Sequence, residues 1–155
     1  MDNFMPSVNE QQLLGLVDDF IQTASSRHSA LEGVVGLLAS NYRHFNWTGI
    51  YILDNGILKL GPYRGEPSPH VAIPVDNGIC GTAVREGKTI VVPDVSADSR
   101  YLACSIRTKS EIVVPIFKDS KIVGEIDIDS DNLDAFKEVD QRILELVAKK
   151  LSGLF

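Results

Sequence analysis

Apolar residues recur every three or four positions near both ends of the chain, a spacing that predicts amphipathic helices. The first helix is expected to end at about Ala24, with a capping box formed by Ser7 and Glu10. A second helix is expected after a polar break, and a terminal helix is expected to begin near Asp134. The residues that define the three apolar faces are Leu13, Leu14, Val17, Phe20 and Ile21, then Leu31, Val34, Val35, Leu38 and Tyr42, and finally Phe136, Val139, Ile143, Leu146 and Val147.

The middle of the chain instead alternates between apolar and polar residues, which is typical of β-strands. Asn55-Gly56 predicts a tight hairpin turn, because both residues accept positive φ. Lys118-Asp119-Ser120 predicts the short polar turn of a second hairpin. The strands predicted from these patterns are Trp47–Leu53, Ile57–Leu60, Val71–Val75, Thr89–Val92, Glu111–Phe117 and Lys121–Asp129.

The segments between these strands contain many turn-forming residues. Gly61–His70 is expected to be a loop, and Asn77–Gly87 a loop that enters a short helix ended by Gly87. Pro93–Thr108 is expected to be irregular. Because hairpins dominate, we expect an α+β fold with a mainly antiparallel sheet. The terminal helices would cover one face, and the loops would leave a ligand pocket on the other.

The bulk composition restricts the function classes. A chain of 155 residues with 44% hydrophobic and 23% charged residues predicts a single domain over 1–155. A net charge of −6 without a basic stripe argues against nucleic-acid binding, and no apolar run reaches the length of a membrane span. The N-terminal residues do not resemble a signal peptide, which favours the cytoplasm and reduced thiols. Two cysteines without clustered histidines predict no structural metal site.

Candidate chemistry gathers around the second predicted hairpin. Asp127 and Asp129 are two apart in a strand and therefore point to the same face. Glu111 lies on the preceding strand, and Cys104 lies shortly before it. Acidic side chains on a central strand are costly unless they are solvated, paired or bound to a ligand. We therefore expect a polar pocket for a cation or a protonated group, with Glu125 solvated at its edge.

Several segments carry a family resemblance, and they read NWTGIYIL, LGPYRGEP, GICGTAV, YLACS, SEIVVPI and GEIDIDS. In this order the chain resembles a GAF domain and, more narrowly, the free methionine-(R)-sulfoxide reductases. Cys80 and Cys104, 24 positions apart, match two of that family's cysteines. A third cysteine of typical members is replaced here by His70, and the usual Asp after the reactive cysteine by Ser105.

The resemblance implies an oxidoreductase that repairs free L-methionine-(R)-sulfoxide. Cys104 would attack the substrate sulfur and become a sulfenic acid, with Arg107 available to stabilise its thiolate. Glu111 or Asp129 would protonate the sulfoxide oxygen. Cys80 would then form a disulfide with Cys104. A thioredoxin-like protein or a small thiol would reduce this disulfide, so no bound cofactor is expected.

The resemblance also implies the substrate contacts. Glu111, Asp127 and Asp129 would hold the α-ammonium group, which a peptide-bound methionine lacks. Trp47 and Tyr51, four apart in the first strand, would wall the pocket around the methyl group.

Other interpretations remain open from the residues alone. Cys80 fits a buried structural thiol as well as a redox role, and aromatic residues in a strand are commonly core residues. The alternative function is a catalytically silent GAF module that binds a small ligand and signals through partner contact. A homodimer that packs through the first and last helices is a further expectation.

Overall fold

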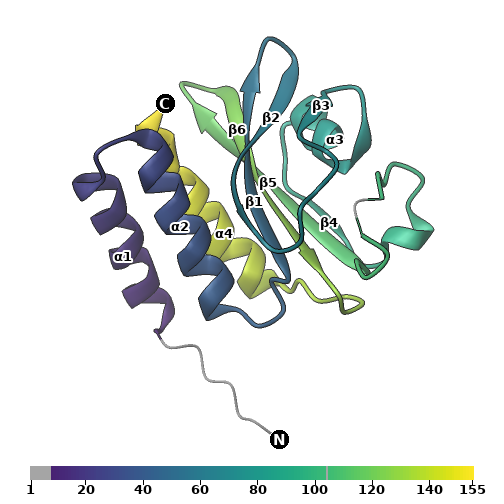
Figure 1. Cartoon of the computed structure of the whole chain (residues 1–155), viewed down its shortest axis with the longest axis horizontal. Coiled ribbons are helices and arrows are strands. Elements are labelled where there is room, and N and C mark those ends of the chain that lie inside the picture. Colours follow the sequence, from purple (N-terminus) through teal and green to yellow (C-terminus); the bar gives the residue numbers. More distant parts are fainter. Residues whose placement is uncertain (1–7, 104) are drawn as a thin grey trace, which may run out of the picture.

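The computed structural model describes residues 8–103 and 105–155. Along these residues, two α-helices come first, six strands follow with one short α-helix among them, and a further α-helix comes after the last strand (Figure 1). They are α1 (Glu10–Thr23), α2 (Arg27–Asn41), β1 (Trp47–Asp54), β2 (Ile57–Arg64), β3 (Ala72–Pro74), α3 (Gly78–Glu86), β4 (Ile90–Val92), a short 3₁₀ helix (Val95–Ala97), β5 (Ser110–Lys118), β6 (Lys121–Ser130), α4 (Glu138–Leu151) and a last 3₁₀ turn (Ser152–Leu154).

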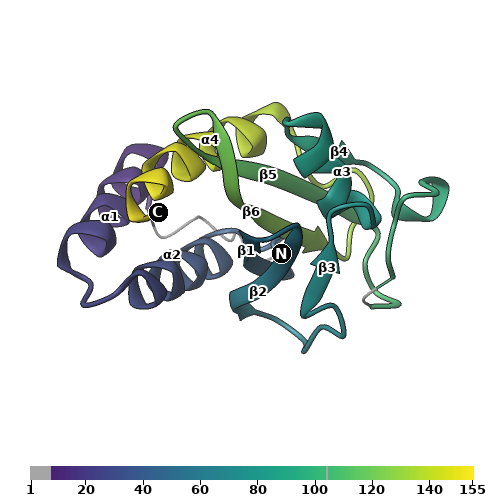
Figure 2. The same cartoon turned by 90° about the horizontal axis from the view of Figure 1, so that it is seen from above.

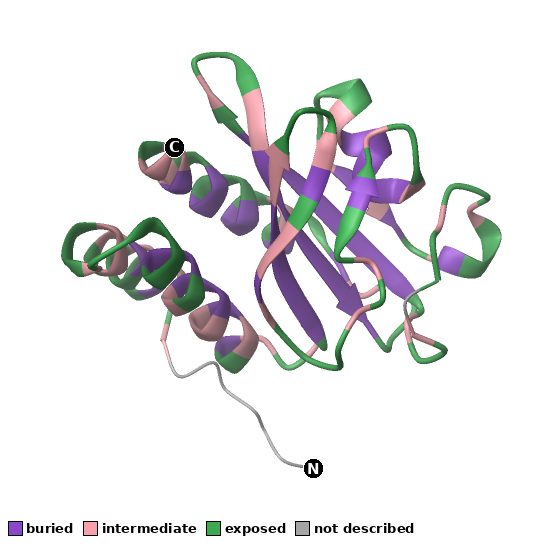
Figure 3. Cartoon of the chain, turned by 45° about the horizontal axis from the view of Figure 1, so that its top comes forward, coloured by how far each residue is buried: buried purple, intermediate pink, exposed green. Residues whose placement is uncertain are grey.

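The strands form one sheet in the order β3-β2-β1-β6-β5-β4, and every neighbouring pair is antiparallel. Helices α1, α2 and α4 form a layer on one face of this sheet, whereas α3 and the connecting loops lie on the other (Figures 1 and 2). The predicted α+β class and the two-sided arrangement are confirmed. β1, β6 and β5 occupy the centre, so their side chains are covered from both directions (Figure 3).

The main hydrophobic core lies between the sheet and the three-helix layer. On β6, Ile126 and Ile128 enter this core, and on β5 Ile112, Val114 and Ile116 do the same. On each of these strands, every second side chain therefore points into the helix-side core. Full burial of one such side chain contributes about 1.5–3 kcal/mol to stability.

Both long hairpins close through turns with two positive φ angles. Asn55 and Gly56 have φ of 49° and 77°, and Asp119 and Ser120 have φ of 50° and 66°. Two left-handed residues in succession match the right-handed twist of the flanking strands. The predicted positions of both turns are confirmed. Gly87, at φ 63°, ends α3 as predicted.

The caps of the outer helices differ from the prediction. α1 begins at Glu10, and its capping box joins Asn9 to Gln12, with the Gln12 N–H donating to Asn9 Oδ1 at 2.8 Å. The predicted box of Ser7 and Glu10 is therefore wrong, and Ser7 itself lies outside the described residues. Asparagine is as good an N-cap as serine, and the choice between nearby candidates depends on packing.

The terminal helix also begins later than predicted. Its N-cap is Lys137, whose backbone N–H donates to the Asp140 carboxylate at 2.8 Å, and Asp134 lies before it at φ 48°. Two residues of the predicted apolar face, Val139 and Leu146, are exposed. Phe136, Ile143 and Val147 of the predicted face are buried in the core, and Leu144, Ala148 and Leu151 join them there.

Strand β2 continues through residues predicted to be a loop. Tyr63 and Arg64 pair with Gly49 and Thr48 of β1. The register shifts between Gly49 and Tyr51, so that Pro62 falls where the ladder is interrupted. A proline is tolerated in a strand at such an irregularity, because no ladder hydrogen bond is needed from it. The Gly/Pro content therefore marked a bulge and not the end of the strand.

Candidate functional site

A pocket lies on the face of the sheet opposite the helix layer, with about 360 Å³ of empty space when the open solvent at its mouth is included. Its base is formed by β1, β5 and β6, and its walls come from α3 and two loops. The lining residues are Trp47, Tyr51, Ser68, His70, Ile73, Gly78, Ile79, Cys80, Leu102, Glu111, Asp127 and Asp129. A concave, largely apolar site with a few polar groups is typical of small-ligand binding.

The strand register brings the predicted carboxylates together. Asp129 of β6 lies opposite Trp47 of β1 on one side and opposite Glu111 of β5 on the other. Asp127 follows on the same face, and its neighbours Ile126 and Ile128 point into the helix-side core. Glu111, Asp127 and Asp129 are 5%, 5% and 3% exposed. They line the pocket as predicted, and they do so as buried groups.

Two aromatic residues of β1 wall the pocket and also hold the loop above it. The Trp47 indole N–H donates to the Glu66 carbonyl oxygen at 2.9 Å, and the Tyr51 hydroxyl donates to the His70 carbonyl oxygen at 2.7 Å. Trp47 also stacks on Tyr63 with ring centroids 5.7 Å apart. Trp47 and Tyr51 both line the pocket, and their contact with a substrate stays a prediction. The interpretation that they are core residues holds as well, since both belong to the smaller hydrophobic cluster on this face.

His70 connects two loops at the mouth of the pocket. Its Nε2 lies 2.9 Å from the Ala103 carbonyl oxygen, and its backbone N–H donates to Ser68 Oγ at 3.1 Å. Contact with a carbonyl oxygen requires the proton on Nε2. His70 therefore joins its own loop to the segment before Cys104.

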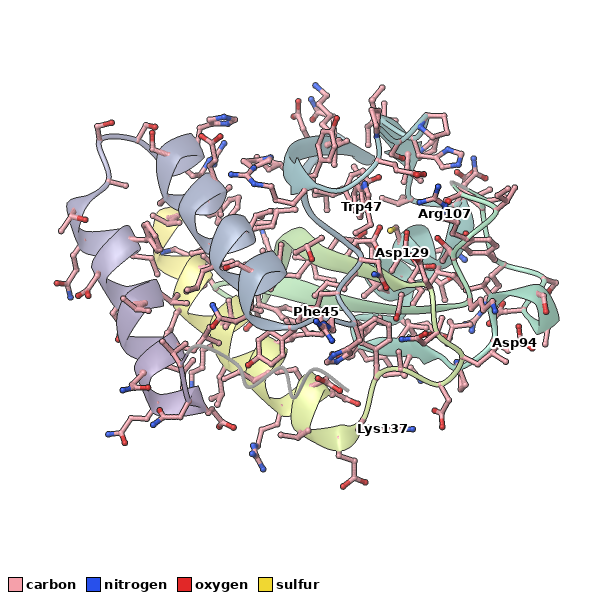
Figure 4. The ribbon with its side chains drawn as sticks, turned by 60° about the horizontal axis from the view of Figure 1, so that its bottom comes forward. Phe45, Trp47, Asp94, Arg107, Asp129 and Lys137 are labelled. Carbon is pink, nitrogen blue, oxygen red and sulfur yellow. The ribbon has the colours of Figure 1, made fainter. Side chains whose placement is uncertain are left out.

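Arg107 lies near the pocket together with Trp47 and Asp129 (Figure 4). Its guanidinium Nη1 lies 3.1 Å from Glu66 Oε1 in an exposed ion pair. Cys104, the predicted nucleophile, lies outside the described residues. The expectation that Arg107 stabilises its thiolate therefore stays a prediction.

Cys80 is a free, buried thiol on α3 that faces the carboxylates. Burial raises the pKa of this thiol well above its ordinary value. The negative charges of Asp127, Glu125 and Glu111 raise the pKa further. The group is consequently held as a thiol, which is the less nucleophilic form.

Glu125 was expected to be solvated, and this expectation is wrong. Its side chain is fully buried, and neither carboxylate oxygen has a hydrogen-bond partner of good geometry among the described residues. Burial raises its pKa well above 4.5; the nearby Cys80 thiol opposes this shift only in part. Period-two alternation placed Glu125 on the pocket face correctly, but α3 packs over β5 and β6 and covers this position.

Asp127 shares this environment. Burial raises its pKa, whereas hydrogen bonding with Glu111 and Cys80 and the charge of His70 lower it. Its Oδ1 is buried without a hydrogen-bond partner in the part of the chain that the structure describes. The pocket therefore holds several buried carboxyl groups close together, and it is suited to a positively charged ligand.

Comparison with known proteins agrees with the fold. The sequence profile of the GAF domain family matches residues 26–153. The chain belongs to the GAF domain family. One relative in this family is the free methionine-R-sulfoxide reductase of Escherichia coli, 36% identical over 122 residues, which cover 78% of this chain and 73% of the relative.

Solved structures of GAF proteins superpose over nearly the whole chain. The free methionine-R-sulfoxide reductase of Neisseria meningitidis, in complex with its substrate, is 31% identical with a TM-score of 0.90, and 100% of this chain and 96% of that chain are covered. The reduced enzyme of Staphylococcus aureus is 40% identical with a TM-score of 0.87 and 94% coverage of both chains. The predicted membership of this GAF reductase group is confirmed. Among the described helices, none has the length and apolar character of a membrane span.

Proposed function

We propose that this GAF protein reduces free L-methionine-(R)-sulfoxide to methionine. The observation that carries the proposal is the meeting of Glu111, Asp127 and Asp129 beside the aromatic wall of one buried pocket. The relatives named for this activity support the proposal, including one solved with its substrate.

The carboxylates account for selection of the free amino acid. A substrate α-ammonium group can donate up to three hydrogen bonds, and charge-assisted bonds to carboxylates are the strong ones. Asp127 Oδ1 supplies a buried acceptor that has no other partner within the described residues. A methionine inside a peptide has an uncharged amide at this position and offers the carboxylates no charged donor. Trp47 and Tyr51 supply apolar surface for the thioether end.

The proposed chemistry has two steps. In the first, the Cys104 thiolate attacks the sulfoxide sulfur, while Glu111 or Asp129 protonates the oxygen. The oxygen is transferred to Cys104, which becomes a sulfenic acid, and methionine leaves with its sulfur reduced by two electrons. In the second, the Cys80 thiol condenses with the sulfenic acid, which gives a disulfide and releases water.

The second step must overcome the environment of Cys80. Because burial and neighbouring charges raise its pKa, the thiol has to pass its proton through an adjacent carboxylate to the departing hydroxide, which leaves as water as the S–S bond forms. A thioredoxin-like protein or a small thiol would then supply two electrons to reopen the disulfide. The proposal requires no bound cofactor and places the reaction in the reducing cytoplasm.

The decisive experiment is turnover of each free sulfoxide epimer with dithiothreitol as reductant. We expect activity confined to the R epimer, lost in Cys104→Ser and reduced in Cys80→Ser. A Ser105→Ala variant serves as a matched control beside Cys104 and should keep turnover. Full turnover by Cys104→Ser would remove the nucleophile from the scheme, and a folded wild type without turnover would overturn the function.

One observation favours a second candidate function. The described cysteine, Cys80, is buried and held as a thiol, and the usual third cysteine of the resembling family is His70 here. A catalytically silent GAF module would bind methionine or its sulfoxide in the same pocket and act through a partner, for which the homodimer through α1 and α4 remains a prediction. Calorimetric binding without turnover would establish this alternative.

A further inference from the structure

Three different metal-binding groups converge in the pocket from three separate elements. They are Cys80 on α3, Glu111 on β5 and Asp127 on β6, and all three are buried. One ligand atom from each, Sγ and two carboxylate oxygens, lies within 4.8 Å of the others. These residues show no metal-binding spacing in the sequence, because each comes from a different element. The sequence predicted no metal site, because that prediction could use only the spacing of residues along the chain.

The separation and the chemistry of this set suit a particular class of ion. Zn²⁺ binds thiolate sulfur at about 2.3 Å and carboxylate oxygen at about 2.1 Å, so that neighbouring ligands around it lie roughly 3.5 Å apart. The three ligand atoms lie within 4.8 Å of one another in the structure, and small side-chain rotations would bring them to the separation that a bound zinc ion needs. A thiolate selects against Mg²⁺ and Ca²⁺, which prefer oxygen ligands alone.

A second observation points to a missing ligand at this place. Asp127 is 5% exposed and lines the pocket, and its Oδ1 has no hydrogen-bond partner among the described residues. Glu125 is buried beside Cys80, and neither of its carboxylate oxygens has a hydrogen-bond partner of good geometry among the described residues. Burying carboxylates without partners is costly, and a bound cation removes that cost.

We propose that the pocket also binds a thiophilic divalent cation of the Zn²⁺ class through Cys80, Glu111 and Asp127, and that this cation and the substrate's ammonium group exclude each other. The site shares two carboxylates with the proposed substrate site, but it does not depend on reductase chemistry. The thiol distinguishes the two ligands, because an ammonium group gains from carboxylates alone, whereas the cation also bonds sulfur. A fourth position stays open to water from the pocket mouth.

Co²⁺ is the probe that tests this site, because a cobalt–thiolate bond gives a charge-transfer absorption in the near ultraviolet. The full-length reduced protein is titrated with Co²⁺ in metal-free buffer. We expect the charge-transfer band to appear, and to disappear when Zn²⁺ is added. It should be absent in Cys80→Ser and persist in Cys104→Ser. Asp127→Asn should weaken Co²⁺ binding by at least about tenfold.

The controls separate this site from other binding. Asp54→Asn removes an exposed carboxylate from the end of β1 and should leave the titration unchanged. Absence of the band, or a band that survives in Cys80→Ser and is lost in Cys104→Ser, overturns the proposal. If Cys80→Ser does not fold, Asp127→Asn decides the matter, because unchanged Co²⁺ affinity in that variant also overturns the site.

Mutual exclusion is tested by titrating Co²⁺ in the presence of free methionine. We expect the apparent Kd for Co²⁺ to rise with methionine concentration, and to rise less with equal glycine, which chelates cobalt similarly but lacks the thioether. Equal effects of the two amino acids overturn the exclusion. Turnover measured in chelator tests the proposed function independently, so that a failure of one proposal is distinguishable from a failure of the other.

Discussion

The two faces of the central sheet are built from the same strands, yet one face buries apolar side chains and the other buries acidic ones. On the helix side, Ile126 and Ile128 of β6 pack into a continuous apolar core. On the other side, Glu125, Asp127 and Asp129 of the same strand are buried to a similar extent. The helix side contributes stability through apolar burial. The pocket side instead buries acidic groups, a condition typical of functional sites.

The largest effect is expected when an acid is moved to the wrong face. Ile126→Asp would place a carboxylate among apolar side chains and should destabilise the protein by about 4 kcal/mol or more. Ile126→Val is the matched control and should cost about 0.5–1.5 kcal/mol. Urea denaturation followed by circular dichroism measures both. A loss under 2 kcal/mol for Ile126→Asp would show that the two faces are not as different as the burial pattern implies.

A smaller effect is expected when one pocket charge is neutralised. Asp127→Asn keeps the shape and removes an anionic partner of the substrate ammonium group. Loss of one such charged contact should raise the KM for free methionine sulfoxide by roughly 30-fold or more, since it costs about 2–5 kcal/mol. Steady-state kinetics measures this, and Asp131→Asn is the control, because Asp131 lies outside the pocket in a neighbouring hollow that Trp47 and Asp129 also line. An unchanged KM in Asp127→Asn would contradict the assigned contact.

The pH dependence of stability sharpens the comparison further. The raised pKa of Glu125 means that the folded state keeps a proton that the unfolded chain releases above its ordinary value of 4.5. The contribution of Glu125 to stability is therefore greatest at or below that value and falls as pH rises toward the folded pKa, by about 1.4 kcal/mol for each pH unit over which only the folded state holds this proton. Glu125→Gln should flatten this fall, with Asp127 adding a residual slope in the same direction.

Denaturation curves at a series of pH values test this prediction. Glu145→Gln, on the exposed side of α4, is the control that should retain the wild-type slope. If Glu125→Gln and wild type lose stability in parallel as pH rises, then Glu125 is ionised in the folded protein.

The smallest effect is expected at the rim of the pocket. Arg107→Ala breaks an exposed ion pair with Glu66, and such pairs contribute about 0–1 kcal/mol. We expect unchanged thermal stability within about 2 °C. If the thiolate of Cys104 depends on Arg107, the variant's rate of alkylation by iodoacetamide should still fall at neutral pH. A Glu66→Gln variant breaks the same pair and should keep that rate, so equal effects of the two variants would deny Arg107 a separate role.

The parts of the structure that follow from local chemistry could be predicted from the sequence. Asn55-Gly56 required a primed turn, and alternation placed Asp127 and Asp129 on one face. What could not be predicted depends on elements distant along the chain. Burial of Glu125 requires α3 to pack over β6, and nothing in its own segment indicates that cover.

The helix termini were less predictable for a related reason. Near the start of α4, Asp134 is a residue type that often caps a helix, but the observed N-cap is Lys137, whose backbone N–H donates to the Asp140 carboxylate inside the first turn. The apolar face of α4 was displaced for the same reason, since Leu144 and Ala148 became buried in place of Val139 and Leu146. Cys104 stays a prediction at every level, since it lies outside the described residues.

The double use of Trp47 and Tyr51 has a consequence for how this pocket can evolve or be redesigned. The side chains that form the pocket wall also fasten the loop of Glu66 and His70 by hydrogen bonds. A change of Trp47 that enlarges the pocket for a bulkier ligand would at the same time release the loop that covers it. Altered specificity thus requires a second, compensating substitution in the loop, which makes single-step drift toward a new ligand rare.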